Sequence, residues 1–224
     1  MSALVLGTPW SEVHELLLPA LGQTALMVAI VMSVVVSFGL PLGLLIFNTS
    51  PAGLTPHRAV HLSISWVANL GRSLPFLVLM AAIIPFTRLV VGTTIGIRAA
   101  IIPMSLAGIA FFARLVESAV RDIAPELLDV GRASGGSTWQ IVRSVQLVEA
   151  LPGLVAALTI NLIAMIEYSA IAGAIGAGGL GYLAVNYGYQ QFDNNIMISC
   201  IVLLIALVQV IQFSGDRAVR ALQH

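Results

Sequence analysis

Long apolar stretches alternate along the chain with short segments that contain glycine, proline or polar residues. A helix needs about 20 mostly apolar residues to cross the ~30 Å hydrocarbon core of a bilayer. Five stretches are long enough to do so. The pattern therefore predicts an all-α polytopic membrane protein with five transmembrane helices, at about 21–47, 59–84, 97–117, 151–172 and 194–213.

Proline interrupts three of these predicted spans, at Pro41, Pro75 and Pro103. Proline has no backbone N–H and tends to kink the helix that contains it. Within a membrane, neighbouring helices or hydroxyl side chains must satisfy the carbonyls that a kink frees. The prolines therefore favour a packed bundle that can bend over a simple membrane anchor.

Composition supports a membrane location, since 58% of the residues are hydrophobic and only 9% are charged. A soluble domain carries about 25% charged residues. The net charge is zero, so nothing indicates a nucleic-acid partner. The single cysteine, Cys200, lies in an apolar run, where we expect it to act as a small buried hydrophobe.

The first 20 residues lie outside the predicted spans. They lack the positively charged region of a removable signal peptide. Trp10, Val13 and Leu16 give the segment an apolar face, which predicts a short helix lying at the membrane interface.

The distribution of arginine predicts the orientation, because cytoplasmic segments carry an excess of positive residues. With the N-terminus outside, seven arginines fall in inner segments and two in outer ones, while Arg72 lies within span two. We therefore expect the N-terminus outside and the C-terminus in the cytoplasm. The inner arginines are 58, 114, 121, 132, 143, 217 and 220, and the outer ones are 88 and 98.

The segment between spans three and four, about 118–150, is expected on the cytoplasmic side and is unusually polar. Nine of the chain's twenty charged residues fall between Arg114 and Glu149. Pro125 suits the first turn of a helix, and the glycines at 135–136 suit its end. Ser137 and Gln140 then have the spacing of a capping box, which opens a second helix. The pattern predicts a helix, a tight glycine turn and a second helix.

This segment has two readings. It is either a solvated connector or a docking element for a soluble partner. A connector has no need of an exposed tryptophan, whereas Trp139 beside branched aliphatic residues suits a groove in a partner protein.

The segment resembles the E-A-A loop of permease subunits of binding-protein-dependent ABC importers. Asp129-Val130-Gly131, Gly135 and the run 145–148 keep the spacing of that loop, although both alanines and the final proline are replaced. Further stretches resemble the methionine-type importer permease: NLGRSLPF at 69–76, IIPFTRLVVGTTIG at 83–96, EALPGL at 149–154, YSAIAGAIGAGGLG at 168–181 and IQFSGDRAVRALQH at 211–224.

The resemblance implies that residues 1–224 form one ABC importer transmembrane domain in a bacterial inner membrane. It implies a homodimer surrounding the translocation pathway, two cytosolic ATP-binding subunits that dock on the loop at 126–148, and an extracytoplasmic binding lipoprotein that delivers methionine or a relative. ATP and Mg²⁺ are expected on the partner, because the chain has no P-loop motif and no lysine. The residues expected to couple to the ATPase are Asp129, Gly131, Gly135, Ser137, Trp139 and Arg143.

Glu167 lies within predicted span four, past its centre. An ionisable residue at mid-membrane costs about 2.5–3.5 kcal/mol on insertion scales, and such residues usually face a cavity or a partner. Glu167 is either hydrated near the outer interface, paired with an arginine such as Arg72, or exposed to the pathway, where it would meet the ammonium group of an amino acid. The other candidate pathway residues are Arg72, Ser73, Asn161, Met165, Tyr168 and Ser169.

Other functions fit the sequence less well than a permease does. Residues 176–181 satisfy G-x-G-x-x-G, but a predicted membrane helix precedes them where a dinucleotide fold needs a strand, so a tight turn is expected instead. The four histidines are too scattered for a metal site. An intramembrane protease would need a histidine or lysine at bilayer depth, but the histidines lie near the predicted membrane edges and the chain has no lysine. A secondary transporter would be expected to show an internal repeat, and none is evident in the sequence. A permease of the same architecture for another amino acid or a short peptide remains the main alternative.

Overall fold

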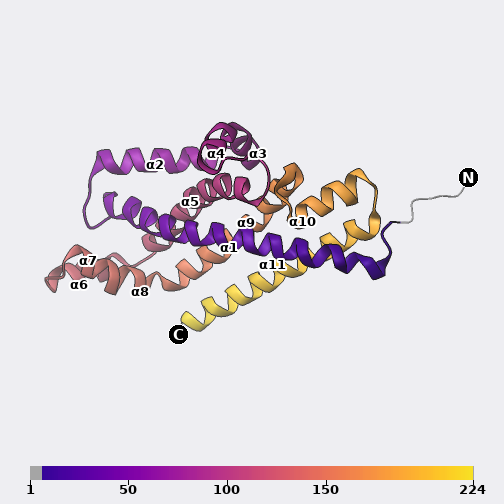
Figure 1. The fold of residues 1–224 in the computed structure, drawn as a ribbon. Helices are drawn as coiled ribbons and strands as arrows, with labels where there is room; N and C mark the ends of the chain where they lie inside the picture. Colours follow the sequence, from indigo (N-terminus) through magenta and orange to yellow (C-terminus); the bar gives the residue numbers. More distant parts are fainter. Residues whose placement is uncertain (1–6, 224) are drawn as a thin grey trace, which may run out of the picture. The chain divides into compact units, whose positions relative to one another are not determined.

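The structure is a computed structural model that describes residues 7–223, and every regular element among them is helical (Figure 1). The all-α prediction is confirmed. The α-helices are α1 (Trp10–Thr49), α2 (Arg58–Ser73), α3 (Phe76–Ala82), α4 (Ile84–Val91), α5 (Ile97–Arg121), α6 (Pro125–Ala133), α7 (Thr138–Ile141), α8 (Leu147–Glu149), α9 (Leu151–Ala172), α10 (Gly179–Tyr182) and α11 (Asn194–Leu222). Two segments are π-helical, η1 (Val142–Gln146) and η3 (Leu183–Gln190), whereas η2 (Gly173–Ala177) is kinked, because Ile175 and Gly176 do not have helical backbone angles.

Among the described residues, four helical segments are long and apolar enough to cross a membrane, or five when α2 and α3 count as one bent span. The four are Trp10–Thr49, Ile97–Arg121, Leu151–Ala177 and Asn194–Leu222. The chain turns by 104° between α2 and α3, so the stretch predicted as span two is broken rather than straight. Pro75 precedes α3 and explains the break, because it cannot donate a helical hydrogen bond and disfavours helical geometry at Leu74.

The chain divides into two compact units. Of the described residues, the first contains those up to Ser33, Leu74–Leu106 and Leu162–Ile211, and the second contains Val34–Ser73, Ala107–Asn161 and those from Gln212 onward. Helices α1, α5, α9 and α11 contribute residues to both units.

In the first unit, the first turns of α1 pack against α10, η3 and the first turns of α11. The shared core consists of Val13, Ala20, Leu180, Leu183, Ile196 and Cys200. The expected burial of Cys200 is confirmed. The helix predicted near the N-terminus is continuous with span one, since α1 begins at Trp10 and runs without interruption to Thr49.

In the second unit, α1, α2 and α5 meet around the buried residues Ile46, Ala68 and Ala113. One acidic side chain is buried beside this core. Glu117 of α5 forms ion pairs with Arg114 and Arg121 on the same helix, and Arg114 Nη2 also donates to Ser65 O of α2 at 3.1 Å. These partners compensate the charge that Glu117 carries at the end of an apolar helix.

Candidate functional site

The polar segment between α5 and α9 folds into a hairpin of short helices, and we call residues 125–149 the charged hairpin. Helix α6 begins at Pro125, and Gly135 has a φ of 75°, a left-handed value that glycine adopts without strain. Helix α7 begins directly after Ser137. The predicted helix, glycine turn and second helix are confirmed.

Ser137 and Gln140 form the predicted capping box at the start of α7. The Ser137 N–H donates to Gln140 Oε1 at 2.8 Å, and the Gln140 N–H donates to Ser137 Oγ at 3.4 Å. Because α7 has only four residues, it gains little from its own backbone ladder and depends on these terminal bonds. The capping box therefore sets the direction in which the next residues, including Trp139, leave the turn.

The charged hairpin exposes apolar side chains outside the membrane-spanning segments. Trp139 is 69% exposed, Val130 63% and Val148 57%. Large apolar side chains exposed on an ordered polar segment are candidates for an interaction site. Beside them, α6, α7 and η1 surround a hollow of about 450 Å³. Its lining includes Leu127, Val130, Gly131, Ser134, Gly135, Gln140, Ile141, Ser144 and Glu149.

The remaining residues predicted to couple to a partner differ in their surroundings. Asp129 and Arg132 form an exposed ion pair at 2.9 Å on α6. Gly131 faces α7 closely, since an added Cβ would lie 3.2 Å from Ile141 Cγ1, so a side chain at this position would press on Ile141. Arg143 is exposed on η1.

Two residues that the sequence did not single out connect the charged hairpin to the end of α1. Asn48 and Gln146 are both buried, and their side-chain amides hydrogen-bond to each other. Amide side chains near helix ends are usually solvated caps, so their residue type does not indicate a buried pair. The only signal in the sequence is that Gln146 lies on the same helix face as the apolar residues Val142 and Ala150.

The predicted pathway residues on α9 separate into two groups. Asn161, Met165 and Ser169 are buried, so they do not line an open surface of the chain. Asn161 Nδ2 donates to Gly108 O at 3.2 Å, and Ser169 Oγ donates to Ile166 O at 2.7 Å within α9. These residues contribute to helix packing.

The exposed group contains Glu167 on α9 and Arg72 and Ser73 at the end of α2. Tyr168 is half-buried and stacks on Phe76, with ring centroids 4.3 Å apart. Glu167 forms no ion pair with any residue among 7–223. A carboxylate on the outside of a membrane-spanning helix is expensive to place against lipid. Water or another protein surface must therefore meet it.

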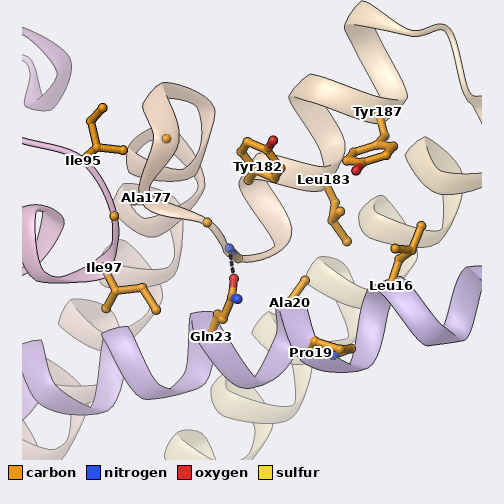
Figure 2. Close-up of a pocket in the computed structure, with 14 residues that line it drawn as sticks. Leu16, Pro19, Ala20, Gln23, Ile95, Ile97, Ala177, Tyr182, Leu183 and Tyr187 are labelled. Atoms are coloured by element: carbon orange, nitrogen blue, oxygen red, sulfur yellow. Dashed lines mark hydrogen bonds between the residues drawn. The ribbon is translucent and has the colours of Figure 1, made fainter.

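A second cavity, of about 640 Å³, lies in the first unit between α1, the loop before α5, the glycine-rich segment 176–179 and η3 (Figure 2). Gln23 Oε1 accepts a hydrogen bond from the Gly179 N–H at 2.8 Å at its edge. No Asp, Glu, Lys or Arg lines it. The cavity thus offers no partner for the charged groups of an amino acid, and we do not assign it to substrate. Within residues 7–223, no group of three or more His, Cys, Asp or Glu is placed to hold a metal ion.

Long apolar helices together with an exposed polar hairpin define a polytopic helical membrane protein with a candidate docking element outside its spans. Residues 39–224 match the family described as the binding-protein-dependent transport system inner membrane component, and the chain belongs to that family. The probable D-methionine transport system permease protein MetI of Vibrio cholerae is 45% identical over 210 residues, which cover 94% of this chain and 93% of that protein. The D-methionine transport system permease protein MetI of Escherichia coli K12 is 44% identical over 183 residues, covering 82% and 84%.

Solved structures give the same result. A chain from inward-facing conformations of the MetNI methionine ABC transporter superposes with a TM-score of 0.92 at 42% identity, over 96% of this chain and 99% of that one. A chain of an amino acid ABC transporter crystallised with histidines has a TM-score of 0.73 at 18% identity over 94% of each chain, which shows the shared fold alone. The resemblance to methionine-type importer permeases is confirmed.

Proposed function

We propose that the chain is the permease subunit of an ATP-driven importer, and that two copies form the translocation pathway for methionine or a closely related amino acid or derivative. The observation that carries the proposal is the charged hairpin. It is an ordered, capped turn that presents Trp139 and Val130 to solvent on a chain 42% identical to one from a methionine ABC transporter.

The charged hairpin suits a partner that binds helices in a groove. Aromatic side chains dominate the binding energy of many interfaces, and the exposed Trp139 is the anchor in this proposal. Gly131, Gly135 and Ser137 hold α6 and α7 in their relative positions, while Asp129 and Arg143 add charged contacts at the rim. The partner is a pair of cytosolic ATP-binding subunits, which carry ATP and Mg²⁺.

The orientation follows from arginine. Apart from Arg72, seven of the nine arginines lie in or next to segments on the side of the charged hairpin, which supports a cytoplasmic location for that side and an N-terminus outside. The opposite side receives the extracytoplasmic substrate-binding protein. Lipid of the inner membrane covers the remaining apolar surface.

Glu167 is the pathway residue in this proposal. It is exposed on α9, whereas Asn161, Met165 and Ser169 on the same helix are buried. In a dimer, a second copy and a water-filled pathway are the surroundings that a carboxylate at this depth tolerates. There it would attract the ammonium group of an amino acid. Arg72 and Ser73 are exposed on α2 and are proposed to support the same pathway.

The decisive experiment is reconstitution. The chain would be purified with its ATPase and inserted into vesicles with the binding protein inside or outside. ATP hydrolysis and uptake would then be measured for methionine, other amino acids and Met-containing peptides. We expect methionine to stimulate both hydrolysis and uptake. Stimulation by another substrate alone would replace the substrate assignment. Uptake without any ATPase would show that the chain is a secondary transporter and not a subunit of an ATP-driven importer.

A further inference from the structure

The side chains of Asn48 and Gln146 form a reciprocal pair of hydrogen bonds between residues 98 positions apart. Asn48 Nδ2 donates to Gln146 Oε1 at 2.9 Å, and Gln146 Nε2 donates to Asn48 Oδ1 at 2.8 Å. Asn48 is 7% exposed and Gln146 is fully buried. A buried amide that loses its partner is strongly disfavoured. The end of α1 and the segment after α7 are therefore held in one register.

Two further hydrogen bonds fix the orientation of the Asn48 side-chain amide. Asn48 Nδ2 also donates to Leu44 O at 2.9 Å, and Asn48 Oδ1 also accepts from the Leu54 N–H at 3.4 Å. Rotating the Asn48 amide by half a turn would oppose oxygen to oxygen and nitrogen to nitrogen. Asn48 is thus held by its own helix and by the loop that follows, and it offers Gln146 one orientation only.

A second bond joins the same two regions on the other side of the hairpin turn. Arg132 Nη2 of α6 donates to Gly53 O at 2.8 Å. The loop around Gly53 is folded back onto the end of α1: the Thr55 N–H donates to Asn48 O at 3.0 Å, and an added Cβ on Gly53 would lie 2.3 Å from the same oxygen. The charged hairpin therefore holds the end of α1 through α6 and through η1.

The position of Gln146 matters for transmission. It is the last residue of η1, the π-helical segment that continues from α7 and leads through α8 into α9. Irregular π-helical turns are found frequently at functional sites. Along the chain, a displacement of α7 is transmitted to α9 through Gln146. The hydrogen bonds between Gln146 and Asn48 would transmit the same displacement to α1.

We propose that Asn48 and Gln146, with Arg132 as a second contact, are positioning residues that make the inner end of α1 move together with the charged hairpin during transport. The inference rests on the proposed function, because the hairpin is displaced by the ATPase. Without the pair, a displacement of the hairpin is taken up by η1 and α9, and α1 is left behind. The amide pair is neutral and buried, so it is insensitive to salt, unlike the exposed Arg132 contact.

The test uses the full complex of permease, ATPase and binding protein in vesicles, with uptake and ATP hydrolysis measured on the same sample. Gln146→Leu keeps the size of the side chain and removes both hydrogen bonds. We expect hydrolysis to stay within about twofold of wild type and uptake per ATP to fall about fivefold, in the range seen for coupling residues. The matched control is Thr49→Val, since Thr49 is buried at the same end of α1 and its hydroxyl donates to Leu45 O at 2.7 Å and Ile46 O at 3.2 Å within that helix.

The exchanged pair, Asn48→Gln with Gln146→Asn, moves one methylene across the contact and keeps both amides. Uptake per ATP restored toward wild type supports the proposal, and it does so even where Gln146→Leu alone fails to assemble. If uptake per ATP in Gln146→Leu equals that of wild type, the proposal is overturned. This includes the case in which uptake and hydrolysis both fall in the same proportion, which would show a merely structural role. A wild-type complex that needs no ATPase for uptake is a different result, which would defeat the proposed function itself.

Discussion

Asp193 binds Thr8 across 185 residues of sequence. Asp193 Oδ2 accepts a hydrogen bond from the Thr8 N–H and another from the Thr8 hydroxyl, each at 2.7 Å. Its other oxygen, Oδ1, accepts from the N–H groups of Asn195 and Ile196, each at 3.1 Å, so the same carboxylate is also the N-cap of α11. Asn195 Nδ2 completes the contact by donating to Thr8 O at 3.1 Å. One acidic side chain thus joins the segment before α1 to the last helix.

Replacing Asp193 by asparagine should destabilise the first unit. An amide still caps α11, but its NH₂ group would face the two donors of Thr8. Hydrogen bonds to a charged group contribute about 1.5–3 kcal/mol, so a loss of that order is expected. Thermal unfolding of the purified protein in detergent measures it. Asp216→Asn is the control, because Asp216 is an exposed carboxylate on the same helix. An equal drop in Tm for both variants would show that the Thr8 contact contributes nothing particular.

The same contact predicts a dependence on acid. Burial alone would raise the pKa of Asp193, but the hydrogen bonds from the Thr8 hydroxyl, the Thr8 N–H, Ile196 and Asn195 outweigh it and lower that pKa below its usual value. A carboxylate with a depressed pKa stabilises the folded state at every pH above the usual value of about 3.9, and this contribution is lost as pH falls through the folded pKa. We expect the Tm difference between wild type and Asp193→Asn to be constant from pH 7 to about 5 and to shrink below about 4. A difference that persists at low pH contradicts the assignment.

Local signals in the sequence were sufficient for the charged hairpin and for α9. Pro125, Gly135 and the spacing of Ser137 to Gln140 act within a few residues, so their effect does not depend on the rest of the chain. Helix α9 occupies the same range, 151–172, that the apolar run predicts. The resemblance to importer permeases extended these local predictions to the fold as a whole.

Long-range polar contacts and the inward face of the spans were not predictable. The pairs Thr8–Asp193 and Asn48–Gln146 join residues 185 and 98 positions apart, with nothing local to indicate a partner. In a membrane-spanning helix both lipid and protein neighbours are apolar, so hydrophobic periodicity does not distinguish the buried face from the outer one. For that reason the sequence pattern groups Asn161 and Met165 with Glu167 as pathway candidates, although in the structure they are buried and Glu167 is exposed.

Trp139 should be the main anchor for the ATPase. It is 69% exposed on α7, a four-residue helix that begins with the Ser137–Gln140 capping box. Truncating a central aromatic anchor costs about 2 kcal/mol or more, so Trp139→Ala should weaken binding of the ATPase about 30-fold. Titration of the ATPase against the permease in nanodiscs measures it. Trp10→Ala is a suitable control, because Trp10 is 62% exposed and lies outside the hairpin. If Trp139→Ala binds the ATPase with wild-type affinity, the hairpin face that contains Trp139 is not part of the interface.

Glu167 should influence which substrates pass, without altering assembly. Its side chain is exposed on α9, while Ser169, two residues later, is buried and bonded to its own helix. Glu167→Gln removes the charge and preserves the shape. If the carboxylate meets the ammonium group of an amino acid, maximal uptake of methionine should fall about tenfold, equal to ~1.4 kcal/mol, and the ranking of competing amino acids should change.

The comparison with Glu167→Asp and Ser169→Ala separates charge from packing. Glu167→Asp retains a carboxylate on the pathway side and should recover part of the uptake, whereas Ser169→Ala changes only a bond within α9. Binding-protein-stimulated ATP hydrolysis should remain close to wild type in all three variants, because none of them lies on the charged hairpin. Uptake kinetics in Glu167→Gln that match wild type for every amino acid tested would mean that the carboxylate lies in a hydrated surface away from the substrate. The exposed Arg72 and Ser73 would then be the remaining polar candidates for the pathway.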